Sequence, residues 1–172
     1  MTRPLSFALI GDGTSDQALA WIITWAIRRL HPDATLRNVG FIARRGRSLV
    51  ETVQSAASEL KPDLLFVHRD AERVPLAERR EEIPEETGVV KVVPVRMTEA
   101  WLLIDIEAIR CAAGNPNGTI GLDLPPVQKL ERLPDPKGLL QKLLVEASEL
   151  QSPRRKKRFK RDLGQLVQRV AA

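Results

Sequence analysis

The chain has 172 residues, of which 43% are hydrophobic, and its 27 Lys and Arg outnumber its 22 Asp and Glu to give a formal net charge of +5. This composition is typical of a globular protein, and it excludes a disordered, collagen-like or disulfide-rich chain. A zinc site of the usual spacing and an internal disulfide are also excluded, because the only histidines are His31 and His68 and the only cysteine is Cys111.

Short apolar runs alternate with helical patterns in the first two thirds of the chain. Strands are predicted at residues 5–10, 35–43, 63–68 and 89–95. Capping-box spacing begins a helix after the first strand and after the second, and a further helix runs from Thr98 to about residue 113. Pro94 indicates that the fourth strand is an edge strand or ends there. The alternation favours an α/β fold with a Rossmann-like, mostly parallel four-stranded sheet flanked by helices.

The rest of the chain is predicted to be helical. Helical spacing appears at residues 127–133 and 136–150, and in a last helix that begins at Pro153. We expect an α/β core at residues 1–113 and a helical C-terminal extension at 114–172, packed on the same domain. No apolar run approaches the roughly 20 residues that cross a bilayer, so no membrane partner is expected. The lone cysteine indicates a cytoplasmic protein.

Acidic residues follow three of the predicted strands. Asp12 follows the first, Asp70 and Glu72 follow the third, and Glu99 follows the fourth. Ligands gather at the carboxyl ends of parallel strands, and carboxylates gathered there repel one another unless a cation lies between them. Mg²⁺ or Mn²⁺ fits such oxygen ligands better than zinc does. The structural alternatives are a turn residue for Asp12, a charged surface run for Glu72 and a first-turn acid for Glu99.

Two neighbours of these acids have structural interpretations. Asp16 is assigned to the first turn of a helix, where a carboxylate complements the helix dipole. His68, at the end of the third strand, is interpreted as a partly buried histidine with satisfied hydrogen bonds. A catalytic base is the alternative for His68.

Basic residues form two candidate phosphate-binding groups. The first, Arg44, Arg45 and Arg47, lies where a helix starts after the second strand. The second lies in residues 154–161, RRKKRFKR, whose seven charges subtracted from +5 leave −2 for the rest of the chain. We expect this segment to attract DNA or RNA without sequence specificity, and a solvated basic helix is the alternative. Its candidate contacts are Arg154, Arg155, Lys156, Lys157 and Arg158.

Three motifs together resemble the Toprim fold: GDGTSDQAL after the first strand, the D-x-E of LLFVHRDAER after the third, and EAWLLID after the fourth. They are most similar to a bacterial Toprim-related group with E-G-x-T-E, D-x-D and E-x-W-L-L-x-D signatures. The PDPK run at residues 134–137 is also similar to that group. The resemblance covers roughly residues 5–140.

Toprim domains occur in topoisomerases, primases, recombination proteins and nucleases. The resemblance therefore implies a Mg²⁺- or Mn²⁺-dependent hydrolase that transfers phosphoryl groups or cleaves nucleic acid, with a role in mobile-element or phage-defence biology. It implies proton transfer by Asp12, metal binding by Asp12, Asp70 and Glu72, and a supporting role for Glu99. Lys137, in the PDPK run, joins the phosphate-binding set.

Two residues depart from the family pattern. Asp12 stands where the family usually has Glu, and Glu72 stands where it usually has Asp. A non-catalytic nucleic-acid-binding or regulatory module with a degenerate site is therefore the alternative. A haloacid-dehalogenase phosphatase is excluded because Ile10 occupies the position of the nucleophile, and no P-loop is present. A response-regulator receiver fits the EAWLL motif and the helical tail less well.

Overall fold

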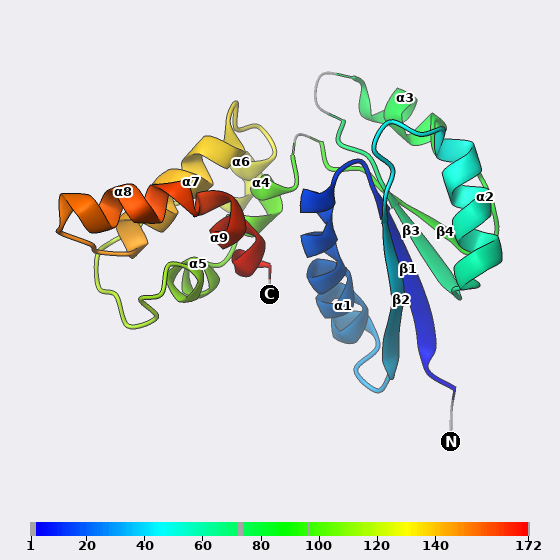
Figure 1. Ribbon diagram of the computed structural model, residues 1–172, viewed down its shortest axis with the longest axis horizontal. Coiled ribbons are helices and arrows are strands. Elements are labelled where there is room, and N and C mark those ends of the chain that lie inside the picture. The colour runs from blue at the N-terminus through cyan, green and yellow to red at the C-terminus, as the bar shows by residue number, and fades with distance from the viewer. Residues whose placement is uncertain (1–2, 72–73, 96, 172) are drawn as a thin grey trace. The chain divides into compact units, whose positions relative to one another are not determined.

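The computed structural model describes residues 3–71, 74–95 and 97–171. The chain divides into two compact units, Met1–Val95 and Arg96–Ala172 (Figure 1). Within the described residues, no helix is both long enough and apolar enough to cross a membrane.

The first unit is built on a parallel sheet. Its strands are β1 (Leu5–Gly11), β2 (Leu36–Ala43), β3 (Leu64–His68) and β4 (Val89–Val92). They lie in the order β2-β1-β3-β4, and each neighbouring pair is parallel. The predicted α/β fold is therefore confirmed. β4 is an edge strand that ends before Pro94, as expected for a residue that cannot donate to a ladder.

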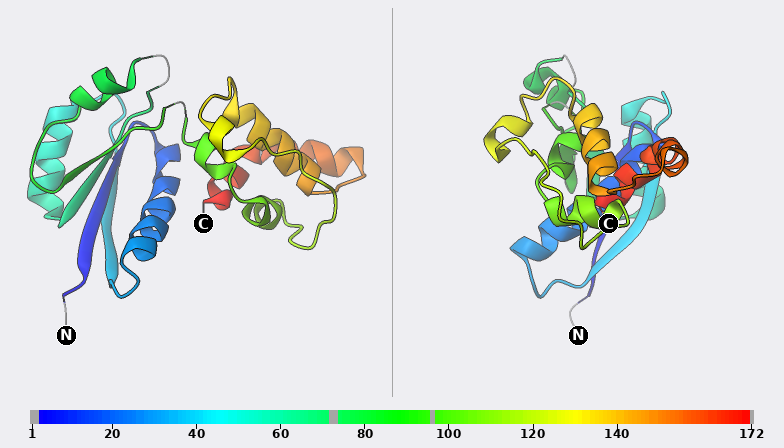
Figure 2. Two further views of the ribbon diagram at one scale, coloured as in Figure 1. Left: turned by 180° about the vertical axis from the view of Figure 1, so that it is seen from behind. Right: turned by 90° about the vertical axis from the view of Figure 1, so that its left-hand side faces the viewer.

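Helices cover both faces of this sheet. The 3-10 helix η1 (Thr14–Ala18) and helix α1 (Leu19–Leu30) follow β1, α2 (Leu49–Leu60) follows β2, and α3 (Leu76–Glu81) follows β3. α1 lies on one face, and α2 and α3 lie on the other (Figures 1 and 2). In the strand order, β2 lies at one edge of the sheet and β4 lies at the other.

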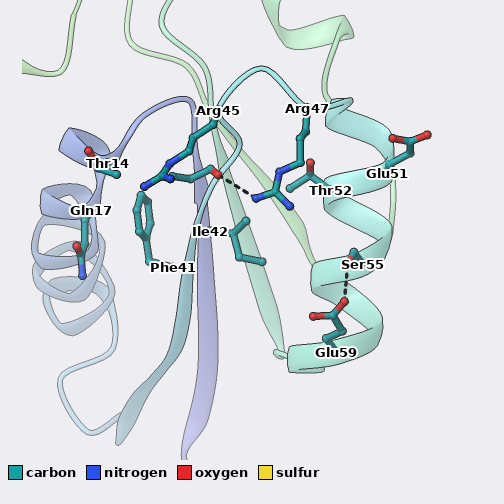
Figure 3. A pocket seen from close by; sticks show the side chains of 11 residues that line it. Thr14, Gln17, Phe41, Ile42, Arg45, Arg47, Glu51, Thr52, Ser55 and Glu59 are labelled. Carbon is teal, nitrogen blue, oxygen red and sulfur yellow. Dashed lines mark hydrogen bonds between the residues drawn. The ribbon is translucent and has the colours of Figure 1, made fainter.

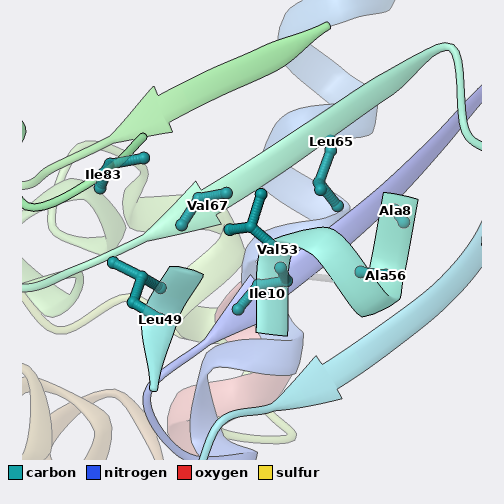
Figure 4. Close-up of a cluster of buried hydrophobic side chains, with 8 residues drawn as sticks. All are labelled: Ala8, Ile10, Leu49, Val53, Ala56, Leu65, Val67 and Ile83. Carbon is teal, nitrogen blue, oxygen red and sulfur yellow. The ribbon is translucent and has the colours of Figure 1, made fainter. Parts of the chain in front are cut away.

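Alternating side chains of the strands fill the two layers. Phe7 and Phe66 point to the α1 side, where their rings meet edge to face with centroids 5.9 Å apart. The opposite side packs against α2 (Figure 4), and burying each large apolar side chain there contributes roughly 1.5–3 kcal/mol. This second layer consists of Ala8, Ile10, Leu49, Val53, Ala56, Leu65, Val67 and Ile83. The packing fixes the strand ends that carry the charged residues.

The second unit is helical. Its helices are α4 (Glu99–Leu102), α5 (Ile106–Ala112), α6 (Val127–Leu130), α7 (Pro136–Ala147), α8 (Pro153–Arg161) and α9 (Leu163–Val170). α7 contacts α4, α5, α8 and α9. Ile109, Leu140, Leu143 and Leu144 are buried at these contacts. Both α7 and α8 begin with a proline. Proline has no N–H, and at the first position of a helix an N–H would have no partner within the helix.

Two segments predicted as single helices are split in the structure. The side chain of Asp105 accepts a hydrogen bond from the Ala108 N–H at 3.0 Å, which starts α5 as a separate helix after α4. The last helix is divided at Asp162 into α8 and α9. Because α4 contacts α7, and α5 contacts both α7 and α9, the two units divide after residue 95 and not at residue 113.

Candidate functional site

The carboxyl ends of β1, β2 and β3 meet at one edge of the sheet, because these strands are parallel neighbours. The Arg44 N–H donates to the Gly11 carbonyl at 2.8 Å, and the Arg45 N–H donates to the Asp12 carbonyl at 3.2 Å. Asp70 follows β3 at the same edge. The structure thus brings together Asp12, Asp70 and the arginines that follow β2.

The carboxylate of Asp12 is held by two guanidinium groups. Its Oδ1 accepts from Nη2 of Arg44 at 2.7 Å and from Nε of the same residue at 3.1 Å. Its Oδ2 accepts from Nε of Arg69 at 3.0 Å. Arg69 also contacts Glu82, and its side chain is only 14% exposed. Both oxygens of Asp12 are therefore occupied by protein cations, and such charge-assisted hydrogen bonds are among the stronger ones.

His68 lies between two carboxylates at the end of β3. Its side chain is 1% exposed, with Nδ1 3.3 Å from Oδ2 of Asp16 and Nε2 3.2 Å from Oδ1 of Asp70. Burial opposes protonation, but the hydrogen bonds with Asp16 and Asp70 outweigh it and raise the pKa of His68 to about 9. His68 is therefore a cation at neutral pH.

Asp16 lies in the first turn of η1, and its side chain also contacts residues outside that turn. Its Oδ2 accepts from the Gly13 N–H at 3.0 Å and also faces His68. Burial acts to raise the pKa of Asp16, but the hydrogen bonds from His68 and Gly13 hold it below its ordinary value. The first-turn interpretation of Asp16 was thus incomplete, since this carboxylate also stabilises the buried imidazolium.

The predicted metal ligands that the structure describes are paired with protein cations. Asp12 is bound by arginines, and Asp70 contacts His68. Among the described residues, no group of three or more His, Cys, Asp or Glu side chains is placed to hold a metal ion. Sequence reasoning assumed that acids gathered at one edge need a metal, but Arg44, Arg69 and protonated His68 supply the positive charge. As they stand, these side chains do not fit a divalent cation.

The structure does not place the other two predicted acids relative to this cluster. Glu72 lies outside the described residues. Glu99 belongs to the second unit, where its Oε1 lies 3.9 Å from Nζ of Lys137. Lys137 is half-exposed and so retains access to solvent.

The loop from β2 to α2 has an unusual backbone. Arg45 has a φ of 49° and Gly46 a φ of 80°, so two successive residues are left-handed. A side chain such as that of Arg45 adopts this conformation at a cost. Ser48 then caps α2 by accepting from the Glu51 N–H at 3.4 Å. The loop turns the chain sharply from β2 into α2 and presents the Arg45 and Arg47 side chains at its surface.

A pocket of about 720 Å³ lies beside this loop, along the open edge of β2 (Figure 3). Arg45 extends toward Phe41 on the η1 side, while Arg47 lies on the α2 side and donates to the Ala43 carbonyl at 3.5 Å. Within the described part of the chain, neither arginine forms an ion pair with a carboxylate. The remaining lining residues are Thr14, Gln17, Ile42, Glu51, Thr52, Ser55 and Glu59. Two guanidinium groups that form no described ion pair, beside an aromatic ring, suit a ligand that carries phosphate.

The basic segment at residues 154–161 forms helix α8. Its cations are largely exposed, and Phe159 is half-buried. Among the described residues, the only ion pair of this helix joins Arg161 and Asp162 at 3.8 Å. The five predicted contacts, Arg154, Arg155, Lys156, Lys157 and Arg158, therefore present unneutralised positive charge to solvent.

Sequence reasoning missed Arg69 and the contacts of His68. Arg69 directly follows β3 and lies next to Asp70, so its position at the strand ends was visible in the sequence. Its pairing with Asp12 requires β1 and β3 to be neighbours, which no local pattern specifies. The same strand order brings Asp16 to His68.

Comparison with known proteins does not assign the chain to a family or a function. The chain matches no protein-family model, and it has no significant match among curated proteins or solved structures. The Toprim resemblance therefore stays a prediction from the motifs, and functional conclusions depend on the arrangement of the residues themselves.

Proposed function

We propose that the protein binds nucleic acid through its phosphate groups, and that the carboxyl end of the sheet serves binding and not metal-dependent catalysis. The observation that carries this proposal is the arrangement of arginines. Arg44 and Arg69 neutralise Asp12, while Arg45 and Arg47 beside the pocket have no acidic partner among the described residues. A negatively charged ligand therefore finds positive charge at this edge without a metal ion.

Helix α8 supports the same function from the second unit. Clustered exposed cations release counterions when they contact phosphates, so they bind nucleic acid of any sequence with an affinity that falls as salt rises. A cytoplasmic location belongs to this proposal, and the single exposed Cys111 supports it.

The test compares Arg45→Ala/Arg47→Ala with Arg37→Ala, an exposed arginine near the amino end of β2. Binding of a fluorescent oligonucleotide is measured by anisotropy at several salt concentrations. We expect the double variant to reduce the slope of log affinity against log salt by about 1.5 to 2, and the control to leave it nearly unchanged. Equal slopes in all three proteins would refute binding at the pocket.

Metal-dependent phosphoryl transfer is the second candidate. Asp12 and Asp70 lie at neighbouring strand ends, their side chains are 36% and 29% exposed, and the Toprim resemblance assigns both to the metal. Titration with Mg²⁺ or Mn²⁺ in a calorimeter separates the candidates. Metal binding by the wild type that disappears in Asp70→Asn would favour catalysis, whereas no metal binding by the wild type would rule it out.

The variant Asp12→Asn provides a second test that distinguishes the binding proposal from the catalytic candidate. The binding proposal predicts that this variant keeps or increases its oligonucleotide affinity, because one negative charge is removed beside Arg44 and Arg69. The catalytic candidate predicts the loss of any Mg²⁺-dependent cleavage of nucleic acid. Both properties can be measured on the same preparation.

A further inference from the structure

Helix α1 exposes two tryptophans. Trp21 is 57% exposed and Trp25 is 61% exposed, although the chain contains only three tryptophans. The buried residues of this helix are Leu19, Ala20, Ile23 and Ile27. Successive helical residues are about 100° apart, so Trp21 and Trp25 lie on the side of α1 opposite its buried side. Two large aromatic side chains left in water on one helix face indicate a binding surface.

The charged residues of α1 are all basic. Arg28 and Arg29 follow within one helical turn of Trp25 and are exposed. The sequence of α1, LAWIITWAIRRL, contains no acidic residue. Within the described part of the chain, neither arginine forms an ion pair. The surface therefore combines two tryptophans, whose Cα atoms are about 6 Å apart along the helix axis, with two guanidinium groups that form no described ion pair.

The chemical groups on this surface indicate which ligand it binds. Indole rings stack on flat aromatic rings, and guanidinium groups bind phosphate. Unpaired nucleotides present both groups together. A duplex hides the faces of its bases within the stack, so only its phosphates reach such a surface.

We propose that Trp21 and Trp25 stack on unpaired bases of a single-stranded nucleic acid whose phosphates contact Arg28 and Arg29. This inference rests on the proposed nucleic-acid binding and adds that the bound strand is unpaired at α1. Stacking depends little on base identity, so the surface binds single strands of different sequence.

The test uses an oligothymidylate of about 12 nucleotides and a mixed-sequence duplex of the same length. We expect the single strand to quench tryptophan fluorescence in the wild type. Trp21→Ala/Trp25→Ala is expected to weaken single-strand binding at least about tenfold while leaving duplex binding nearly unchanged. Trp21→Phe/Trp25→Phe retains the aromatic faces and is expected to recover most of the affinity. Trp101→Phe, at a half-buried tryptophan of the second unit, is the matched control.

Several outcomes would overturn the inference. Single-strand and duplex affinities that fall equally, or that both stay unchanged, would exclude stacking. A loss of thermal stability as large as that of a core truncation would assign the two tryptophans to packing. Anionic vesicles that shift the tryptophan emission where oligothymidylate does not would assign the surface to lipid. If any of these outcomes is found together with duplex binding that depends on Arg45 and Arg47, the stacking inference is wrong but the proposed nucleic-acid binding is still supported.

Discussion

The carboxyl end of the sheet and helix α8 contain similar charged groups in opposite surroundings. At the sheet, His68 and Arg69 are almost buried, and each contacts carboxylates within hydrogen-bonding distance or close to it. In α8, the cations are largely exposed, and their one described ion pair, Arg161 with Asp162, is long. Buried charges need partners to offset the cost of losing water, whereas exposed cations keep their hydration and stay available to a ligand.

Because these two groups of charges have different surroundings, the net charge of the chain alone does not indicate what its charged residues do. The charges at the strand ends are paired with one another, and His68 is the described cation of both Asp16 and Asp70. The charges of α8 have one described ion pair, Arg161 with Asp162, and the proposed function assigns them to phosphate binding. We therefore expect substitutions at the sheet to change stability most, and substitutions in α8 to change binding most.

The largest expected effect on stability belongs to His68→Ala. This substitution leaves Asp16 mostly buried and without its cation, and losing one member of a buried ion pair costs about 3–5 kcal/mol. The free energy of unfolding is measured by urea denaturation at pH 7. Lys142→Ala is the control, because its pair with Glu146 lies at the surface and contributes at most about 0.5 kcal/mol. Equal losses of unfolding free energy in the two variants would show that the buried charges at the strand ends do not stabilise the fold more than surface charges do.

The next effect is a dependence of stability on pH. The pKa of His68 is raised from 6.5 to about 9, so its contribution to stability is complete below pH 6.5 and is lost as pH rises through about 9. The loss amounts to roughly 3 kcal/mol. We expect the wild type to lose stability over this range and His68→Gln to lose much less. Unfolding curves at a series of pH values measure the difference, and parallel profiles for the two proteins would contradict it.

Asp16 gives a smaller effect at low pH. Because its pKa is lowered in the folded protein, Asp16 contributes stability that is present above the ordinary carboxylate pKa and is lost as pH falls through the lowered value. Asp16→Asn removes that contribution, and we expect its acid unfolding profile to be flatter than that of the wild type. Identical acid profiles would show that Asp16 does not stabilise the fold through its charge.

A smaller effect again is expected from Arg69→Met. The methionine fills a similar volume but leaves Oδ2 of Asp12 without its donor and removes one partner of Glu82. Both acids are more than a third exposed, so water replaces part of the lost interaction and the cost is about 1–2 kcal/mol. Arg80→Met, on helix α3, provides the surface control. A change in urea midpoint no larger than that of the control would show that Arg69 does not stabilise the strand ends.

The sequence predicted the sheet and the residues at its edge because both depend on local patterns. Apolar runs that end in glycine or charged residues identified the strands. Parallel strands then put Asp12, Asp70 and Arg44 at the same edge of the sheet, and the strand order decides which of them meet. Asp105 is also a signal for the start of α5 that the sequence contains, because aspartate is a favoured N-cap residue.

What the sequence could not provide is the choice of partner for each charge. Composition alone does not say which of several basic residues binds Asp12. The strand order decides that Arg44 and Arg69 do. The sequence analysis considered the acids without these cations, and the metal expected between the acids stays a prediction. The break at Asp162 was equally hidden, since helical spacing continues through it and no described side chain caps α9.

The smallest expected effect on stability, and the one that sharpens the comparison most, concerns α8. Replacing Arg154, Arg155, Lys156, Lys157 and Arg158 by Gln keeps residues that favour helices and removes five positive charges. Because these side chains have no described acidic partner, we expect the free energy of unfolding to change by no more than about 0.5 kcal/mol. Oligonucleotide affinity should nevertheless fall, and its dependence on salt should become clearly weaker, because fewer counterions are released on binding. A stable variant with unchanged binding would show that α8 is only a solvated surface, and an unstable variant would show that its charges hold the second unit together.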